Sequence, residues 1–193
     1  MDASRRAADD LALRARASAI IKERSFRFGN FILVSGRTSH YYLDMKPTMF
    51  DPEGANVLAR LVLDRIAEFK PDFIGGLEMG AVPLVASVTV LSQEIGRPVR
   101  GFFVRKGAKD HGTRKLVDGV TNGALRDKNV IILEDVTTKG MSAMQAVSAA
   151  RAEGAKVALV LSIVDREEGA AEFFRRQRLL FDFLFKASEF RAE

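Results

Sequence analysis

Apolar residues follow an alternating pattern of strands and helices along most of this chain. The runs Val130–Leu133 and Val157–Leu161 are apolar at every position, which is typical of strands covered by helices on both faces. Predicted helices separate these runs, so the pattern predicts an α/β fold with a doubly wound parallel sheet. The predicted strands are Phe73–Gly76, Val99–Val104, Val130–Leu133, Val157–Val164 and Leu180–Phe185, and the predicted helices are Pro52–Phe69, Ala81–Glu94, Met141–Glu153 and Glu167–Arg175.

A different pattern precedes these elements. Alanine, arginine and spaced apolar residues predict an amphipathic helix over Ala3–Lys22. Strands are expected at Phe31–Val34 and Tyr41–Met45, around the turn Ser35–Thr38. The pair Asp51-Pro52 then marks a helix start, because aspartate accepts the first free amide hydrogens and proline suits the first helical position.

Length and composition narrow the class of protein. With 193 residues, a net charge of +5, 47% hydrophobic and 28% charged residues, we expect one core-forming domain, with an N-terminal region, 1–48, before an α/β core, 49–193. The absence of cysteine excludes disulfides, thiolate zinc sites and a cysteine nucleophile, and two histidines exclude a three-histidine metal site. The longest uncharged stretch, Met79–Gln93, is shorter than the roughly 18 apolar residues of a membrane span. Early acidic residues argue against a secretory signal, so we expect a cytoplasmic protein.

The most informative segment runs from Val130 to Ser142, where a buried strand leads through two acids into hydroxyls and a glycine. Amide hydrogens at a helix start bind phosphate, helped by the helix dipole, by hydroxyls and by the close approach that glycine permits. The carboxylates of Glu134 and Asp135 can accept hydrogen bonds from vicinal hydroxyls, such as those of a ribose. Hydroxyls and glycine alone would fit an ordinary capped turn equally well, but the paired acids favour a ligand site. The candidate phosphate-binding residues are Thr137, Thr138, Lys139, Gly140, Met141 and Ser142.

Two further places carry candidate chemistry. The segment Arg105–Lys115 places five cations against one acid on a glycine-containing loop, which suits an anion, although a solvated charged loop is the commoner outcome for such a cluster. His111 favours anion binding, because imidazole can donate to a diphosphate oxygen. Arg166 follows a predicted strand and can present its planar fork to a carboxylate or carbonyl, while an ion pair with Asp165 or Glu168 is an equally open alternative.

These segments resemble a known family. The two acids with the Thr/Gly/Ser loop resemble the phosphoribosyl diphosphate (PRPP) signature of the type I phosphoribosyltransferases. The segment from Phe103 to Thr113, with its RKxxKxHG arrangement, resembles the mobile loop of orotate phosphoribosyltransferases. The segment from Phe31 to Lys46 resembles their N-terminal segment, and the order and spacing match over nearly the whole chain.

The resemblance implies a fold, substrates and residue roles. It implies a PRPP-binding core under a small N-terminal hood, Mg²⁺ as the cofactor, and a homodimer with shared active sites. It implies that Arg105, Lys106, Lys109 and His111 bind the departing diphosphate, with Asp135 beside them in the catalytic set and Glu134 on the ribose. Arg166 would contact the orotate ring, with aromatic residues nearby at Tyr41 and Tyr42, of which strand alternation requires one to pack inward.

Some positions depart from the commonest family pattern. Val34 stands where many members have a lysine, and Met79 lies near where some have another. Lys46 could supply the missing charge. Glu134 replaces the more usual aspartate and keeps an acceptor, while Lys139 adds a cation to the phosphate loop. These departures leave the mode of base binding open.

The expected function is transfer of the 5-phosphoribosyl group from PRPP to orotate, in pyrimidine synthesis. One alternative is a phosphoribosyltransferase for another base, because the PRPP loop does not choose the acceptor. A second is a PRPP-sensing regulator on the same fold that binds nucleic acid, which the pI of about 9.7 would permit. The basic residues cluster where diphosphate would bind and no recognition helix is evident, so we expect small-molecule substrates and no nucleic-acid or membrane partner.

Overall fold

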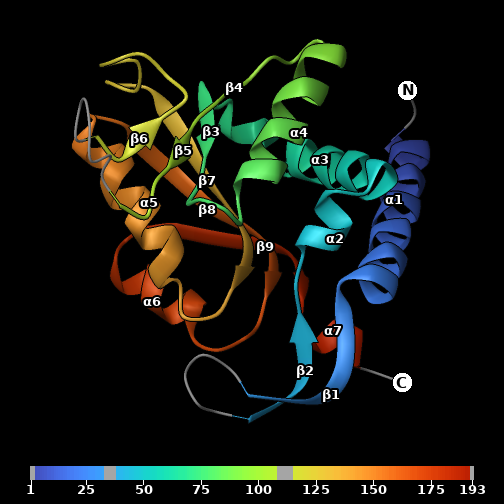
Figure 1. Cartoon of the computed structure of the whole chain (residues 1–193). Coiled ribbons are helices and arrows are strands. Elements are labelled where there is room, and N and C mark those ends of the chain that lie inside the picture. Colours follow the sequence, from blue (N-terminus) through green and yellow to red (C-terminus); the bar gives the residue numbers. More distant parts are fainter. Residues whose placement is uncertain (1–2, 33–37, 108–114, 192–193) are drawn as a thin grey trace.

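A parallel sheet of five strands forms the centre of the protein (Figure 1). The computed structural model describes residues 3–32, 38–107 and 115–191. The strands lie in the order β4-β3-β7-β8-β9, and every neighbouring pair is parallel. This confirms the doubly wound parallel α/β fold. The strand bounds are β3 Phe73–Gly75, β4 Arg100–Gly101, β7 Asn129–Thr137, β8 Lys156–Asp165 and β9 Leu180–Lys186.

Helices cover both faces of this sheet and bury one apolar cluster on each (Figure 1). Ile131 and Leu133 of β7 pack toward α1, α3 and α4, whereas Val130 and Ile132 pack toward α5 and α6. Successive side chains of a strand point to opposite faces, so a continuous apolar run fills both layers. The helices are α1 Ala3–Arg24, α3 Pro52–Ile66, α4 Val82–Glu94, α5 Met141–Ala152 and α6 Ala170–Arg176.

The start of α3 confirms the predicted cap. The Asp51 carboxylate accepts a hydrogen bond from the amide of Gly54 at 2.8 Å, and Pro52 occupies the first turn. The helix ends in the 3₁₀ turn Ala67–Phe69, after which Lys70 takes a left-handed conformation. None of the helices within the described ranges combines the length and the apolar character needed to cross a membrane.

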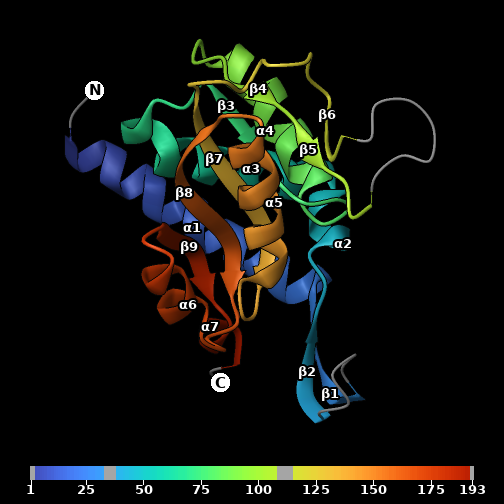
Figure 2. The same cartoon turned by 90° about the vertical axis from the view of Figure 1, so that its left-hand side faces the viewer.

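An antiparallel ribbon projects from the body of the molecule (Figure 2). It consists of β1 Phe26–Ile32 and β2 Thr38–Leu43, so its first strand begins five residues before the predicted one. Of the predicted turn Ser35–Thr38, residues 35–37 lie outside the described residues, and Thr38 is already the first residue of β2. Two short helices that the pattern did not predict, α2 Lys46–Met49 and α7 Ser188–Arg191, lie near the base of this ribbon.

The predicted strand Val99–Val104 is wrong in one respect. The strand is interrupted at buried Phe102 into β4 and β5 Phe103–Val104, and β5 also pairs with β6 Val117–Asp118, which was not among the predicted strands. The Phe102 ring occupies the space where Gly75 would carry a side chain. The backbone nevertheless stays beside the chain of β3, because the Val104 amide donates to the Gly76 oxygen and the Glu78 amide donates to the Val104 oxygen, both at 2.8 Å.

Two other boundaries differ from the prediction. β7 continues past Leu133 to Thr137, because β8 runs alongside it and Thr137 pairs with Asp165. Helix α6 starts three residues late, at Ala170, because Glu167 and Gly169 have positive φ angles of 61° and 106°. Because β7 is longer than predicted, Glu134 and Asp135 lie inside this strand.

Gly76, just after β3, lies in a closely packed part of the fold that leaves no room for a side chain. A Cβ there would collide with the backbone oxygen of Leu133 and with Ala81. We predict that Gly76→Ala lowers the free energy of unfolding by about 3 kcal/mol, measured by thermal denaturation. Gly107→Ala is the control, because no atom of the described part of the chain lies within 4 Å of its Cβ position. Equal midpoints for the two variants would contradict the packing.

Candidate active site

The strand order reverses between β3 and β7, and this reversal defines a crevice. The chain runs from β3 to β4 on one side of it and then returns to β7 on the other. Ligands of open α/β sheets bind outside the carboxyl ends of the strands at such a switch point. The loop after β3 closes one wall: a Cβ on Gly80 would lie 2.7 Å from Oδ1 of Asp135. The peptide bond between Glu78 and Met79 in this loop is cis.

Glu134 and Asp135 stand at the end of β7 on opposite faces of the strand. Glu134 is 7% exposed, and its Oε2 has no hydrogen-bond partner among the described residues. Its pKa is raised to about 8, first because burial removes water from the carboxylate and then because of the charge of Asp135, while Lys106 lowers it. Burial also raises the pKa of Asp135, opposed by a hydrogen bond from the Val136 amide and by the charge of Lys46. Both acids are therefore prepared to gain a hydrogen-bonding ligand.

The segment after the acids forms an open helix start. Gly140 has φ 84°, and α5 begins at Met141 without a side-chain cap. The ring of Phe174 would lie 2.7 Å from a Cβ on Gly140, so packing and conformation both require glycine here. Thr137 is buried with no partner for its Oγ1 among the described residues. Four exposed residues surround the first backbone amides of α5: Thr138, Lys139, Met141 and Ser142. Free amides at such a helix start suit an anion.

The basic segment begins beside this crevice. The backbone amide of Lys106 donates to Oε1 of Glu78 at 2.9 Å, which ties the segment to the loop after β3. Nη1 of Arg105 lies 3.5 Å from Oδ2 of Asp118 on β6. Lys109 and His111 lie outside the described residues, so their predicted roles stay predictions.

Arg166 joins the crevice to the ribbon. Its amide donates to the Thr137 oxygen at 2.9 Å, which links the ends of β8 and β7. Its guanidinium lies 4.8 Å from the centroid of the Tyr41 ring, and its Nε lies 2.9 Å from Oε1 of Glu168. The structure thus contains the ion pair with Glu168 and also holds Arg166 against the ribbon.

The two tyrosines divide as strand alternation requires. Tyr41 is 8% exposed and stacks on Phe26 at 5.1 Å between centroids, whereas Tyr42 is 43% exposed. A pocket of about 660 Å³ separates the ribbon from the loop after β8. Its lining includes Ser39, His40, Tyr41, Arg166, Glu167 and Arg191.

Lys46 lies at the start of α2, close to the acids. Its Nζ lies 2.6 Å from Oδ1 of Asp44, and its pKa is raised chiefly by that hydrogen bond, with a contribution from the charge of Asp135. Met79, which was expected near a position where some family members have a lysine, is 57% exposed, and Val34 lies outside the described residues.

Three acids of this region were not among the predicted site residues. Glu78 receives the start of the basic segment, Asp44 binds Lys46, and Glu168 pairs with Arg166. Glu78 was within reach of sequence reasoning, because it lies in a loop after a parallel strand, where ligands bind. Glu168 was already named from the sequence as an alternative partner of Arg166, whereas Asp44 is recognisable only from its partner in space.

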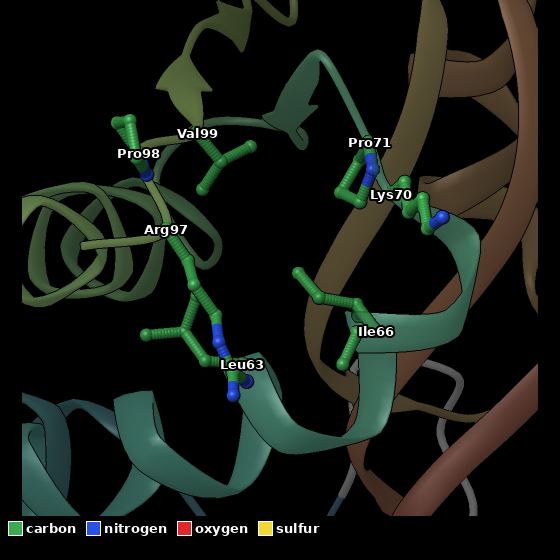
Figure 3. Close-up of a pocket in the computed structure, with 8 residues that line it drawn as sticks. Leu63, Ile66, Lys70, Pro71, Arg97, Pro98 and Val99 are labelled. Carbon is green, nitrogen blue, oxygen red and sulfur yellow. The ribbon is translucent and has the colours of Figure 1, made fainter. Parts of the chain in front are cut away.

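Another pocket, of about 410 Å³, lies at the opposite end of the sheet (Figure 3). Leu63 and Ile66 of α3 form one side of it, and Pro71 and Val99 lie just before the starts of β3 and β4. Arg97 and Lys70 stand on either side of the opening. It lies at the amino ends of the strands, away from the switch point, and contains none of the predicted site residues.

Comparison with known proteins agrees with this geometry. No family model matches the chain. Orotate phosphoribosyltransferase of Rhodopseudomonas palustris (strain BisB5) is 51% identical over 180 residues, which cover 93% of this chain and 96% of that protein. The Aquifex aeolicus enzyme of the same name is 38% identical over 179 residues, covering 91% and 96%.

A solved structure extends the similarity to three dimensions. Mycobacterium tuberculosis orotate phosphoribosyltransferase in complex with PRPP superposes with a TM-score of 0.78 at 27% identity, over 93% of this chain and 99% of that one. The identity to curated relatives over nearly the full length of both chains shows that this chain belongs to the orotate phosphoribosyltransferase family.

Proposed function

We propose that the crevice between β3 and β7 performs the family's reaction, transfer of the 5-phosphoribosyl group of PRPP to a ring nitrogen of orotate. The products are orotidine 5′-phosphate and diphosphate. The observation that carries the proposal is the junction of β7 with α5, where buried Glu134 and half-buried Asp135 lie shortly before an uncapped helix start. Such a junction accommodates a ribose and a phosphate at once.

The loop from Thr137 to Ser142 would hold the 5′-phosphate of PRPP. Its free amides, the positive end of the helix dipole and the hydroxyls all favour a dianion. Lys139 has no ion-pair partner among the described residues and adds a positive charge. The unpartnered oxygens of Glu134 and Thr137 would then bind a ribose hydroxyl and a phosphate oxygen.

Catalysis in this site consists of positioning and charge stabilisation. The anomeric carbon acquires oxocarbenium character as the diphosphate leaves, so the enzyme must neutralise the leaving group and exclude water. Arg105 and Lys106 stand at the start of the segment that would do so, and we assign Lys109 and His111 to the same task. Asp135 would hold the ribose while the bond to diphosphate breaks.

Magnesium fits this site through the substrate rather than through a protein cage. The described residues contain no group of three or more His, Asp or Glu side chains that could hold a metal. Mg²⁺ commonly binds substrate phosphates while it keeps several waters. When bound, it would neutralise the diphosphate, and Glu134 and Asp135 would meet its waters and the ribose.

The acceptor would bind between the ribbon and the end of β8, with residues 1–48 as a hood over the core of residues 49–193. Arg166 offers a planar fork for the carboxylate or carbonyls of orotate, with Tyr41 beneath it. Tyr42 and Lys46 complete the side nearer the ribose. A cytoplasmic location stays a prediction.

Exposed apolar side chains support a homodimer. Phe50, Met79 and Val90 are 70%, 57% and 63% exposed. Val90 shares a groove of about 370 Å³ with Pro52, two residues after Phe50. An exposed apolar side chain in such a groove is typical of an association surface. We propose a two-fold dimer in which Lys109 completes the partner's active site.

A turnover assay tests the function and the acceptor site together. With PRPP and Mg²⁺, orotate releases diphosphate and forms orotidine 5′-phosphate, whereas adenine or uracil releases none. Arg166→Lys should raise the KM for orotate about tenfold and leave that for PRPP nearly unchanged, because lysine cannot reproduce the planar fork. Equal losses for both substrates would refute the assignment of Arg166. Salt-dependent RNA binding without turnover would instead support the regulator.

A pH series tests the state of Glu134. The pKa of Glu134 is raised from 4.5 to about 8 in the folded protein, so the folded protein holds this proton more tightly than the unfolded chain does. The resulting contribution to stability is complete below pH 4.5 and is lost as the pH rises toward 8. Ligand-free Glu134→Gln should therefore become progressively more stable than the wild type between pH 5 and 8, by a total on the order of 4 kcal/mol. Thermal denaturation measures the difference. The exposed Glu68→Gln is the control and should keep the wild-type profile; an identical profile for both variants would disprove the raised pKa.

Mixing two inactive variants tests the shared site. Lys109→Ala and Asp135→Asn chains are combined in equal amounts, so that half the dimers become mixed. In each mixed dimer, one site then combines the unchanged Asp135 of one chain with the unchanged Lys109 of its partner, while the other site carries both substitutions. Half of the dimers thus have one working site of two, so activity should recover to about a quarter of wild type. If Lys109 served its own chain, every site would carry a lesion, and no activity would return despite proven subunit exchange.

A further inference from the structure

The loop that carries Arg166 is fastened to the C-terminal part of the chain. The Ala187 amide donates to the backbone oxygen of Asp165 at 2.8 Å, and the Glu167 amide donates to Oδ1 of the same residue at 2.9 Å. With the bond from Arg166 to Thr137, these contacts place the loop between the end of β7 and the start of α7.

Glu167 makes the side-chain connection between this loop and α7. Its Oε2 accepts the Ser188 amide at 3.0 Å and lies 3.4 Å from Nη2 of Arg191. The pKa of Glu167 is lowered, chiefly by its hydrogen bond with Ser188 and further by the charges of Lys186 and Arg191. Its φ of 61° is uncommon for a residue with a side chain, so these contacts hold a backbone conformation that glutamate alone would not favour.

Helix α7 is itself firmly docked. Phe190 is 1% exposed and contacts the rings of Phe26 and Phe185. Glu189 pairs with Arg14 of α1 at 2.7 Å. A loop tied to α7 is therefore tied to the core.

Two guanidinium groups meet at one tyrosine ring. Arg166 and Arg191 lie 4.8 and 5.3 Å from the centroid of Tyr41, which also stacks on Phe26. Like charges this close repel unless they are compensated, and here each arginine has its own glutamate: Glu168 for Arg166 and Glu167 for Arg191. Removal of the Glu167 carboxylate would leave the backbone bonds of the loop in place, but it would break the side-chain link to Ser188 and leave Arg191 uncompensated beside Arg166.

We propose that Glu167 is a positioning residue, which anchors the Arg166 loop to α7 and neutralises Arg191 so that the Arg166 guanidinium stays over Tyr41 and faces the acceptor. The proposal rests on the proposed function of Arg166 in orotate binding. Its consequence is that the extreme C-terminal helix helps to select the acceptor, although it lies outside the sheet's switch point.

The test compares Glu167→Ala and Glu167→Gln with Glu172→Gln in the intact enzyme. Glu172 is a matched control, because it also forms ion pairs with arginines, Arg175 and Arg176, but within the α6 region and away from the Arg166 loop. We expect Glu167→Ala to raise the KM for orotate about tenfold, with the KM for PRPP within about twofold. Glu167→Gln keeps an acceptor for Ser188 but loses the charge, so its effect should be smaller. Glu172→Gln should change neither constant.

A double variant separates positioning from a general structural role. Glu167→Gln with Arg191→Gln removes both charges, and it should bind orotate more tightly than Glu167→Gln alone. Equal changes in both KM values, or a lower thermal midpoint with an unchanged KM for orotate, would overturn the proposal. Arg166→Lys is measured in parallel: if it weakens orotate binding while the Glu167 variants do not, only the role of Glu167 fails. If Arg166→Lys leaves orotate binding intact, the assignment of Arg166 itself is wrong.

Discussion

The close contact between the loop after β3 and the end of β7 is the constraint on which the site depends. Gly76 has no room for a side chain beside the Leu133 oxygen, and Gly80 lies directly against the Asp135 carboxylate. This approach turns the reversal of strand order into a closed crevice rather than an open sheet edge. Glu134 is buried and Asp135 half-buried just after Leu133, so the packing that builds the site also raises the pKa of both acids.

That burial has an energetic consequence. A carboxyl in a dry environment resists ionisation, and Glu134 has a pKa of about 8 with an oxygen left unpartnered among the described residues. The ligand-free fold thus keeps polar groups in an unfavourable state. A ligand with hydroxyls and phosphate would satisfy them, together with the free amides at the start of α5. Unsatisfied buried groups cost free energy in the ligand-free fold, and a bound ligand that pairs with them would recover part of that cost.

The acceptor side is built differently, from charges that compensate one another. Arg166, Arg191 and their glutamate partners surround Tyr41 in a pocket between the ribbon and the loop after β8. Paired charges hold the arginines in place without a ligand. An anionic acceptor can then share a guanidinium that is already oriented, which reduces the entropy cost of binding. The phosphate side relies on unsatisfied groups, and the acceptor side relies on organised ones.

Much of this could be predicted from the sequence. The apolar runs of β7 and β8 determine buried parallel strands, Asp51-Pro52 determines the start of α3, and the order of acids, hydroxyls and glycine after Leu133 predicts the junction that we propose binds phosphate, because each depends on neighbours in the chain. Tertiary structure alone decided that β7 continues to Thr137, that the strand after Val99 is interrupted at Phe102, and that Glu167 reaches α7. These features depend on a partner strand, a packed ring and a helix distant in sequence, and no local pattern encodes which distant residues will meet.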